Sequence, residues 1–151
     1  MSPSARLAEL GIALPEVAAP LAAYVPAVRT GNLVYTAGQL PLARGELTHA
    51  GKVGAEVSPE DAQAAARTCA LNALAAVDKL VGIDSVVRVV KVVGFVASAA
   101  GFTGQPAVVN GASEFLGEVF GESGAHARSA VGVSELPLNA PVEVELIVEV
   151  S

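Results

Sequence analysis

Arg128 is the charged residue of this sequence whose position is hardest to explain by a role in folding. It lies in a short apolar run, Ala127-Arg128-Ser129-Ala130-Val131, which predicts a β-strand in which a cation is disfavoured. A guanidinium in such a strand pairs with a carboxylate of its own protein or binds one on a ligand, because its planar fork matches a carboxylate bidentately. The internal partner would be Glu143 or Glu145 on the following predicted strand.

The other residues with chemical potential are scattered. Glu143 is either a solvated carboxylate on the outer face of its strand or a general base at the mouth of a cleft. His49 and His126 stand without an obvious nucleophilic partner, which predicts exposed or packing roles. Cys69 falls on the apolar face of a predicted helix, where a buried, inert thiol is expected. One cysteine and two histidines predict no metal site.

The common enzyme motifs are absent from the sequence. It contains no GxGxxG after a predicted strand, no GxxxxGK[ST], no GxSxG and no HExxH. The glycine-rich loop 45–54 lacks the Lys-Ser/Thr pair of a phosphate-binding loop, so a flexible connector is expected there. The chain therefore does not read as a familiar nucleotide-binding enzyme, serine hydrolase or zinc protease.

Composition narrows the class of protein further. The chain has 151 residues, enough for one domain, and is 52% hydrophobic, 4% aromatic and 16% charged, with no Trp. The net charge of −6 and the scattered cations argue against nucleic acid as a partner. The sequence has no uninterrupted apolar run of about 18 residues, so no membrane span is predicted. Its N-terminus shows no secretory pattern, so a cytoplasmic protein is expected.

The first half of the chain predicts a hairpin followed by a helix. A short helix is expected at Ser4–Leu10, then strands at Leu21–Arg29 and Leu33–Gly38 joined by a Gly-Asn turn, then a long loop over residues 40–57. The clearest helix opens at Ser58-Pro59-Glu60-Asp61, which supplies an N-cap, a first-turn proline and two acids, and it ends at Gly82.

The second half predicts alternating strands and helix. A valine-rich strand at Val86–Ser98 precedes a helix that runs from Phe102 to Gly121, and strands follow at Ala127–Val133 and Val142–Val150. In the last strand valines and Leu146 alternate with glutamates. The order β-β-α-β-α-β-β predicts an α+β fold with one mixed sheet and two helices packed on one face. The other face needs a cover, and a symmetric copy of the chain would supply it.

Three ordered motifs resemble those of the RidA/YjgF family of reactive imine/enamine deaminases, formerly called the endoribonuclease L-PSP family. The first is Tyr24-Val25 followed by Tyr35-Thr36-Ala37-Gly38-Gln39-Leu40-Pro41. The second is Asn110 ahead of a helix ending near Phe120. The third combines residues 127–131, Leu136-Pro137 and residues 142–145. The resemblance covers residues from about 20 to 150, which implies an N-terminal extension at 1–20 and a single RidA-like domain at 21–151.

The resemblance implies a chorismate-mutase-like fold and a homotrimer whose sheets form a central barrel, with clefts between subunits. It also implies hydrolysis of reactive 2-imino or enamine acids, such as 2-aminoacrylate, to 2-keto acids and ammonia, with neither cofactor nor metal. The partners expected are therefore a small 2-imino or 2-keto acid and two further copies of the chain.

The resemblance also implies roles for individual residues. Arg128 would clamp the substrate carboxylate, and Glu143 would position or deprotonate the attacking water. Tyr24 would contact substrate from the neighbouring subunit, Gly38 would let the backbone approach the ligand, and Asn110 would lie near the cleft wall. At Ala130 many members carry Cys, so only its backbone would bind substrate or water, and Ala37 replaces the usual Ser.

Two functions follow as competing hypotheses. The first is an imine deaminase, in which Arg128→Ala abolishes turnover. The second is a non-catalytic or regulatory module that binds small carboxylates or a protein in the same clefts, which Ala37 and Ala130 favour. The ribonuclease activity attached to the family name is disfavoured by the acidic charge and the absence of a basic patch.

Overall fold

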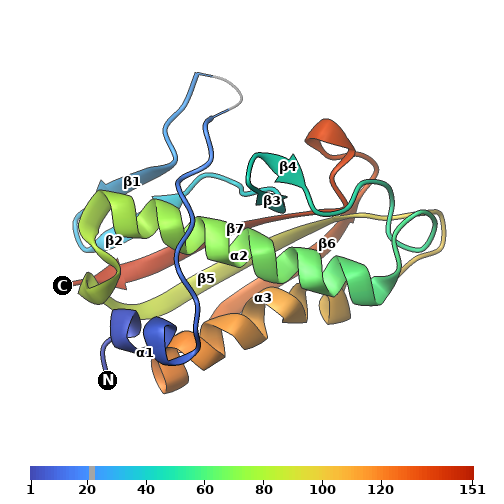
Figure 1. Cartoon of the computed structure of the whole chain (residues 1–151). Coiled ribbons are helices and arrows are strands. Elements are labelled where there is room, and N and C mark those ends of the chain that lie inside the picture. The colour runs from blue at the N-terminus through green and yellow to red at the C-terminus, as the bar shows by residue number, and fades with distance from the viewer. Residues whose placement is uncertain (21–22) are drawn as a thin grey trace.

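The computed structural model describes residues 1–20 and 23–151, and a five-stranded mixed sheet forms its centre (Figure 1). The strand order is β1-β2-β7-β5-β6, in which only β5 and β6 are parallel neighbours. The strands are β1 (Ala27–Thr30), β2 (Leu33–Thr36), β5 (Val86–Ala97), β6 (Ala127–Val133) and β7 (Val142–Val150). The predicted α+β fold with a single mixed sheet is confirmed.

Two long helices, α2 (Pro59–Val81) and α3 (Gln105–Phe120), cover one face of the sheet (Figure 1). Helix α2 begins as predicted, since the Ser58 hydroxyl accepts a hydrogen bond from the Asp61 amide at 3.1 Å. It ends at Gly82, whose φ of 84° favours glycine. No helix among the described residues is long and apolar enough to cross a membrane.

Several boundaries differ from those predicted. Strand β1 begins only at Ala27, after Pro26, and the first two residues of the predicted strand Leu21–Arg29 lie outside the described residues. Helix α3 starts at Gln105 because Gly104 and Pro106 suit a helix start better than its interior. The predicted loop 40–57 contains a small hairpin. Its strands are β3 (Leu42–Ala43) and β4 (Glu46–Leu47).

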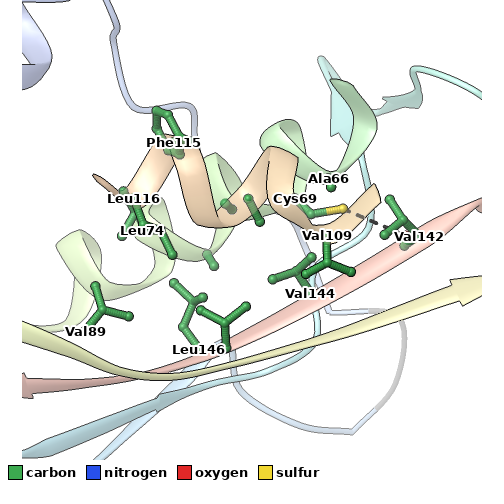
Figure 2. Close-up of a cluster of buried hydrophobic side chains, with 14 of the residues drawn as sticks. Ala66, Cys69, Leu74, Val89, Val109, Phe115, Leu116, Val142, Val144 and Leu146 are labelled. Carbon is green, nitrogen blue, oxygen red and sulfur yellow. Dashed lines mark hydrogen bonds between the residues drawn. The ribbon is translucent and has the colours of Figure 1, made fainter. Parts of the chain in front are cut away.

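The core lies between the sheet and the two helices (Figure 2). Along β7 every second side chain is buried, from Val142 to Val150, as the alternation predicts. Cys69 of α2 is fully buried there and donates a hydrogen bond to the carbonyl of Val142 at 3.7 Å. Burial raises the pKa of the Cys69 thiol, with a further contribution from Glu143, so the thiol stays protonated and inert.

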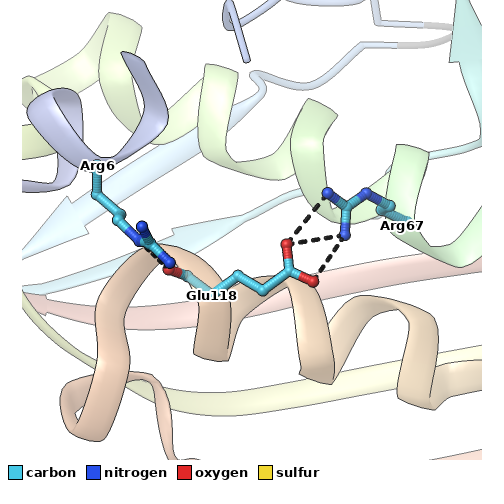
Figure 3. A network of polar contacts seen from close by, with 3 residues as sticks. All are labelled: Arg6, Arg67 and Glu118. Carbon is cyan, nitrogen blue, oxygen red and sulfur yellow. Dashed lines mark hydrogen bonds and ion pairs between the residues drawn. The ribbon is translucent and has the colours of Figure 1, made fainter. Parts of the chain in front are cut away.

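A short helix, α1 (Pro3–Glu9), is fastened to the helical layer by polar contacts. The Ser4 amide and hydroxyl donate to Asp84 of the 3-10 turn η1 (Ile83–Ser85) at 2.8 and 2.6 Å, and these bonds lower the Asp84 pKa. Figure 3 shows Arg6 bonding the carbonyl of Glu118, whose carboxylate forms an ion pair with Arg67 of α2 at 3.2 Å. Helices α1, α2 and α3 are therefore cross-linked at one surface.

The face of the sheet opposite the helices carries exposed apolar side chains. Val28, Tyr35 and Val131 are each exposed by 43–52% although they lie in strands. Val28 pairs with Tyr35, which pairs with Ile147, so these three residues share one face across β1, β2 and β7. The sheet face that the sequence predicts to need a cover therefore exposes apolar side chains in the single chain.

Candidate functional site

Arg128 lies on the edge strand β6 and its side chain reaches α3. It pairs with buried Val92, and paired residues share a face, so its side chain leaves the sheet on the helical side. Its Nη1 donates to Asn110 Oδ1 at 2.7 Å and to the hydroxyl of Ser113 at 3.2 Å, and its Nη2 donates to the carbonyl of Pro106 at 3.3 Å. All three acceptors are neutral.

The predicted ion pair between Arg128 and Glu143 or Glu145 is wrong. No described carboxylate contacts Arg128. Strand β5 separates β6 from β7, and both glutamates point to the open face because they alternate with the buried residues of β7. The sequence order of the two strands suggested an adjacency that the sheet does not have. Arg128 is bonded instead to the three neutral oxygens described above.

Two glycines set the position of α3 over Arg128. A Cβ at Gly94 of β5 would lie 2.5 Å from Cγ2 of Val109, and a Cβ at Gly111 would lie 2.0 Å from the carbonyl oxygen of Gln63 on α2. Since neither Cβ is present, α3 packs closely on both the sheet and α2. This approach brings Asn110, predicted near a cleft wall, into direct contact with Arg128.

Glu143 occupies the open face of β7 and is half-buried there. It pairs with Phe95 of β5, and among the described residues its carboxylate has no hydrogen bond or ion pair. Burial raises the pKa of Glu143, and the neighbouring charge of Glu145 raises it further. A carboxyl with a raised pKa exchanges its proton at higher pH than an ordinary glutamate does, which suits a general base.

An irregularity in the ladder between β2 and β7 places Gly38 against Glu143. The hydroxyl of Thr36, not a backbone carbonyl, accepts the Leu146 amide at 3.0 Å, and regular bonding resumes between Gln39 and Val144. The intervening Ala37-Gly38 segment therefore lies beside β7. A Cβ at Gly38 would lie 2.0 Å from Oε2 of Glu143, so a larger residue would displace the carboxylate.

A groove of about 610 Å³ opens along this segment. Glu143 lies in its wall, and Tyr24 and Gly38 line it as well, so three predicted site residues meet there. The rest of the wall is mainly apolar. It consists of Val25, Val28, Tyr35, Thr36, Ala37, Leu40 and Pro137.

The six predicted site residues thus form two separate groups in one chain. Tyr24, Gly38 and Glu143 line the groove on the open side of the sheet, whereas Arg128 and Asn110 are bonded to each other on the helical side. Ala130 belongs to the second group by position, since it pairs with Gly94 and packs against the core. One chain does not bring Arg128 and Glu143 together.

The structure also gives His126 a partner that the sequence did not reveal. Its Nε2 lies 2.9 Å from the hydroxyl of Ser113, which in turn contacts Arg128. Asn110 and Ser113 are spaced i, i+3 on α3, the spacing that places two helical residues on one face, so this spacing was the available signal. His49 Nε2 lies 3.9 Å from Oδ1 of Asp61. In the described part of the chain no three His, Cys, Asp or Glu residues are arranged to hold a metal.

Comparisons with known proteins relate this chain to a protein family and to individual members of similar sequence. Residues 4–150 match the family model described as "YjgF/chorismate mutase-like, putative endoribonuclease". Protein TCP17 of Trypanosoma cruzi is 45% identical over 150 residues, covering 98% of this chain and 94% of its own.

Solved structures resemble this chain to different degrees in sequence and in fold. Atu1372 of Agrobacterium tumefaciens is 45% identical, with a TM-score of 0.91 over 99% of this chain and 92% of its own. RidA of an Antarctic Psychrobacter is 27% identical, with a TM-score of 0.64 over 89% and 94%. TdcF of E. coli, solved with bound serine, is 24% identical and shares the fold, with a TM-score of 0.63 over 91% and 93%. The chain is thus much more similar to Atu1372 than to RidA.

Proposed function

The chain belongs to the YjgF family, and we propose that it hydrolyses reactive 2-imino acids and their enamine tautomers, of the 2-aminoacrylate type, to 2-keto acids and ammonia. The proposed site lies between subunits of a homotrimer. The family is shown by the match, and the reaction is an inference from the residues that the chain carries at its two half-sites.

The observation that carries the proposal is the state of Arg128. Its positive charge is held in place by three neutral oxygens, and no described carboxylate neutralises it. A partly buried guanidinium of this kind attracts a carboxylate, and its planar fork favours a bidentate one. Serine, the molecule bound to TdcF, has such a carboxylate on a small amino acid. A small 2-imino acid has the same group beside its reactive carbon.

Glu143 supplies the second part of the chemistry. The imine carbon is electrophilic, so the Glu143 carboxylate takes a proton from water while the oxygen attacks that carbon, and it returns this proton to the imine nitrogen to give the carbinolamine. The hydroxyl proton then passes by way of Glu143 to the amine nitrogen as the C–N bond breaks, so that ammonia leaves and the 2-keto acid remains. One water is consumed for each ammonia released. The raised pKa of Glu143 suits both the acceptance and the return of the proton.

The division of the site supports an assembly of several copies. Arg128 and Glu143 lie on opposite faces of the sheet, and the open face exposes Val28, Tyr35 and Val131. A neighbouring copy packed on that face would cover the apolar side chains and could bring its own edge strand β6 toward the groove. The homotrimer proposed here accounts for both features at once.

A deaminase assay tests the proposal directly. We expect the full-length protein to release keto acid from freshly generated 2-aminoacrylate faster than buffer does. Arg128→Ala should reduce kcat/KM by about 100-fold or more, since a charge-assisted bidentate contact of about 3 kcal/mol is lost. Arg128→Lys should restore little of this activity because a lysine lacks the planar fork. The assay follows ammonia and pyruvate together.

The same proteins discriminate the second candidate, a non-catalytic module that binds small carboxylates. Ala130 and Ala37 favour it, because relatives are expected to carry Cys and Ser at these positions. Calorimetry with pyruvate that shows binding by wild type and not by Arg128→Ala, together with release no faster than buffer, would establish the module and reject the enzyme.

A further inference from the structure

We propose that Ser113 and His126 are positioning residues that hold the Arg128 guanidinium in the orientation that receives a carboxylate. This inference rests on the proposed function for its substrate and on the described contacts for its geometry. Neither residue lines the groove that holds Glu143. Ser113 comes from α3 and His126 immediately precedes β6, so the contact joins two elements on either side of Arg128.

The direction of each hydrogen bond in this group follows from the chemistry of its atoms. His126 Nδ1 lies 2.6 Å from the carbonyl of Gly124, which only accepts, so Nδ1 carries a proton and donates. In a neutral imidazole Nε2 is then an acceptor. The Ser113 hydroxyl, 2.9 Å away, donates to it and leaves its own lone pairs for Nη1 of Arg128 at 3.2 Å. The bonds therefore run in one direction, from Arg128 through Ser113 to His126.

This direction strengthens the contact with Arg128. A hydroxyl that donates to a good acceptor becomes a better acceptor itself, because consecutive hydrogen bonds polarise one another. Ser113 without His126 would be free to rotate its hydroxyl proton toward Arg128. In that orientation two donors would oppose each other. His126 thus fixes which way Ser113 presents its oxygen.

The arrangement also determines which hydrogens of Arg128 remain for a ligand. A guanidinium has five N–H bonds. Asn110 and Ser113 accept from Nη1, and Pro106 accepts from Nη2. Nε has no described acceptor and Nη2 carries a second hydrogen, and these two nitrogens form the side-on fork for a carboxylate. The contacts of Asn110 and Ser113 with Nη1 therefore set the orientation of the Nε and Nη2 fork.

The inference is tested first without any substrate. We would record the side-chain N–H signals of Arg128 by NMR in the full-length protein and in Ser113→Ala and His126→Ala. In wild type, restrained rotation of the guanidinium should give resolved Nη signals, and both variants should broaden or merge them. Ser113→Thr keeps the hydroxyl and should restore them, and Ser123→Ala, which removes a hydroxyl bonded elsewhere, should leave them unchanged.

Kinetics provides the second readout. With 2-aminoacrylate as substrate, Ser113→Ala and His126→Ala should raise KM about 3- to 10-fold, the effect of losing one supporting hydrogen bond. Their kcat should stay within about 2-fold of wild type, because neither residue touches the reacting carbon. A fall in kcat with unchanged KM would overturn the positioning role. So would unaltered Nη signals in folded Ser113→Ala and His126→Ala.

The two proposals fail separately. If wild type neither turns over 2-aminoacrylate nor binds pyruvate, the proposed function is rejected, while the NMR signals still decide whether Ser113 and His126 hold Arg128. If wild type is active and Arg128→Ala is inactive but both positioning variants match wild type in KM and in Nη signals, the further inference alone is rejected.

Discussion

Arg128 and Glu143 are both half-buried charged residues, but they are held in opposite ways. Arg128 is fixed by neutral oxygens from α3, whereas Glu143 has no described partner and a raised pKa. A carboxylate that is partly removed from water without compensation destabilises the folded chain in its ionised form. Such an arrangement is common where a group is kept for its reactivity.

The first prediction concerns the stability of Glu143→Gln. Because the folded-state pKa of Glu143 is raised, the folded protein binds this proton more tightly than the unfolded chain does, so the wild type loses stability as pH rises through that pKa. The neutral glutamine avoids the loss. We expect its Tm to exceed that of wild type by about 1–2 °C at pH 7, a small effect because the carboxyl is only partly buried.

Thermal unfolding measured across pH provides the check. The difference should shrink toward zero below about pH 4, where the wild-type carboxyl is protonated in both states. Glu114→Gln, on an exposed part of α3, controls for the change in net charge. A difference that grows at acid pH, or one shared by the control, would contradict the role of burial at Glu143.

At the scale of elements, the position of α3 decides whether Arg128 is held at all. Gly94 lets Val109 of α3 approach β5, and the same approach brings Asn110 and Ser113 to Arg128. The helix therefore has two tasks, closing the core with one face and supplying oxygens to Arg128 from another. A change in its distance from the sheet would affect both.

The second prediction is that Gly94→Ala is destabilising. Its Cβ would lie 2.5 Å from a methyl of Val109, and overpacking of this kind costs about 1–3 kcal/mol. We expect a fall in Tm of roughly 2–12 °C by calorimetry. The matched control is Gly117→Ala on α3, where a Cβ meets nothing within 4 Å and should stabilise the helix by up to about 1 kcal/mol.

A double variant sharpens this test. Val109→Ala removes the methyls that the new Cβ would meet, so Gly94→Ala should cost less in that background than in wild type. Equal costs in the two backgrounds would show that the contact between β5 and α3 does not explain the effect.

Local patterns predicted the elements well and their assembly poorly. The alternation in β7 and the Ser58 cap of α2 are encoded by neighbouring residues, and both are confirmed. The position of β5 between β6 and β7 is not encoded locally, and this led to the wrong ion pair for Arg128. The contact of Ser113 with His126 likewise depends on how closely α3 packs on the sheet. Of the groove residues, Glu143 is a candidate from its own strand pattern, whereas Tyr24 and Gly38 are predicted only by the resemblance to a family.

For the whole molecule, the open face of the sheet is the surface that a single chain leaves without a covering layer. It combines exposed Val28, Tyr35 and Val131 with the groove that contains Glu143. Arg128 is on the other side of the same sheet. A functional unit made of several copies would join the two half-sites and cover the apolar face together.

The third prediction is that two inactive variants complement each other. Arg128→Ala and Glu143→Gln should each be inactive alone. Co-expressed in equal amounts, they should regain up to about one quarter of wild-type activity, because a site formed by two subunits has both native residues in about one of four random pairings. The activity of co-purified mixed assemblies is the measurement.

Light scattering on the same samples gives the number of chains. Mixed assemblies that stay inactive although each variant folds and assembles would place both residues in one subunit's site. A monomer that retains full activity would also contradict the shared site.

The alanines of α2 have a consequence for how this fold is maintained. Seven of the eleven buried residues of that helix are alanine, and valine dominates the strands beneath it. Alanine loses no rotamer freedom on burial and valine loses little, so ordering this core costs less side-chain entropy than ordering one of leucine and methionine. The same residues have few alternative rotamers with which to accommodate a substitution. The helical layer is therefore expected to be stiff and intolerant of larger residues.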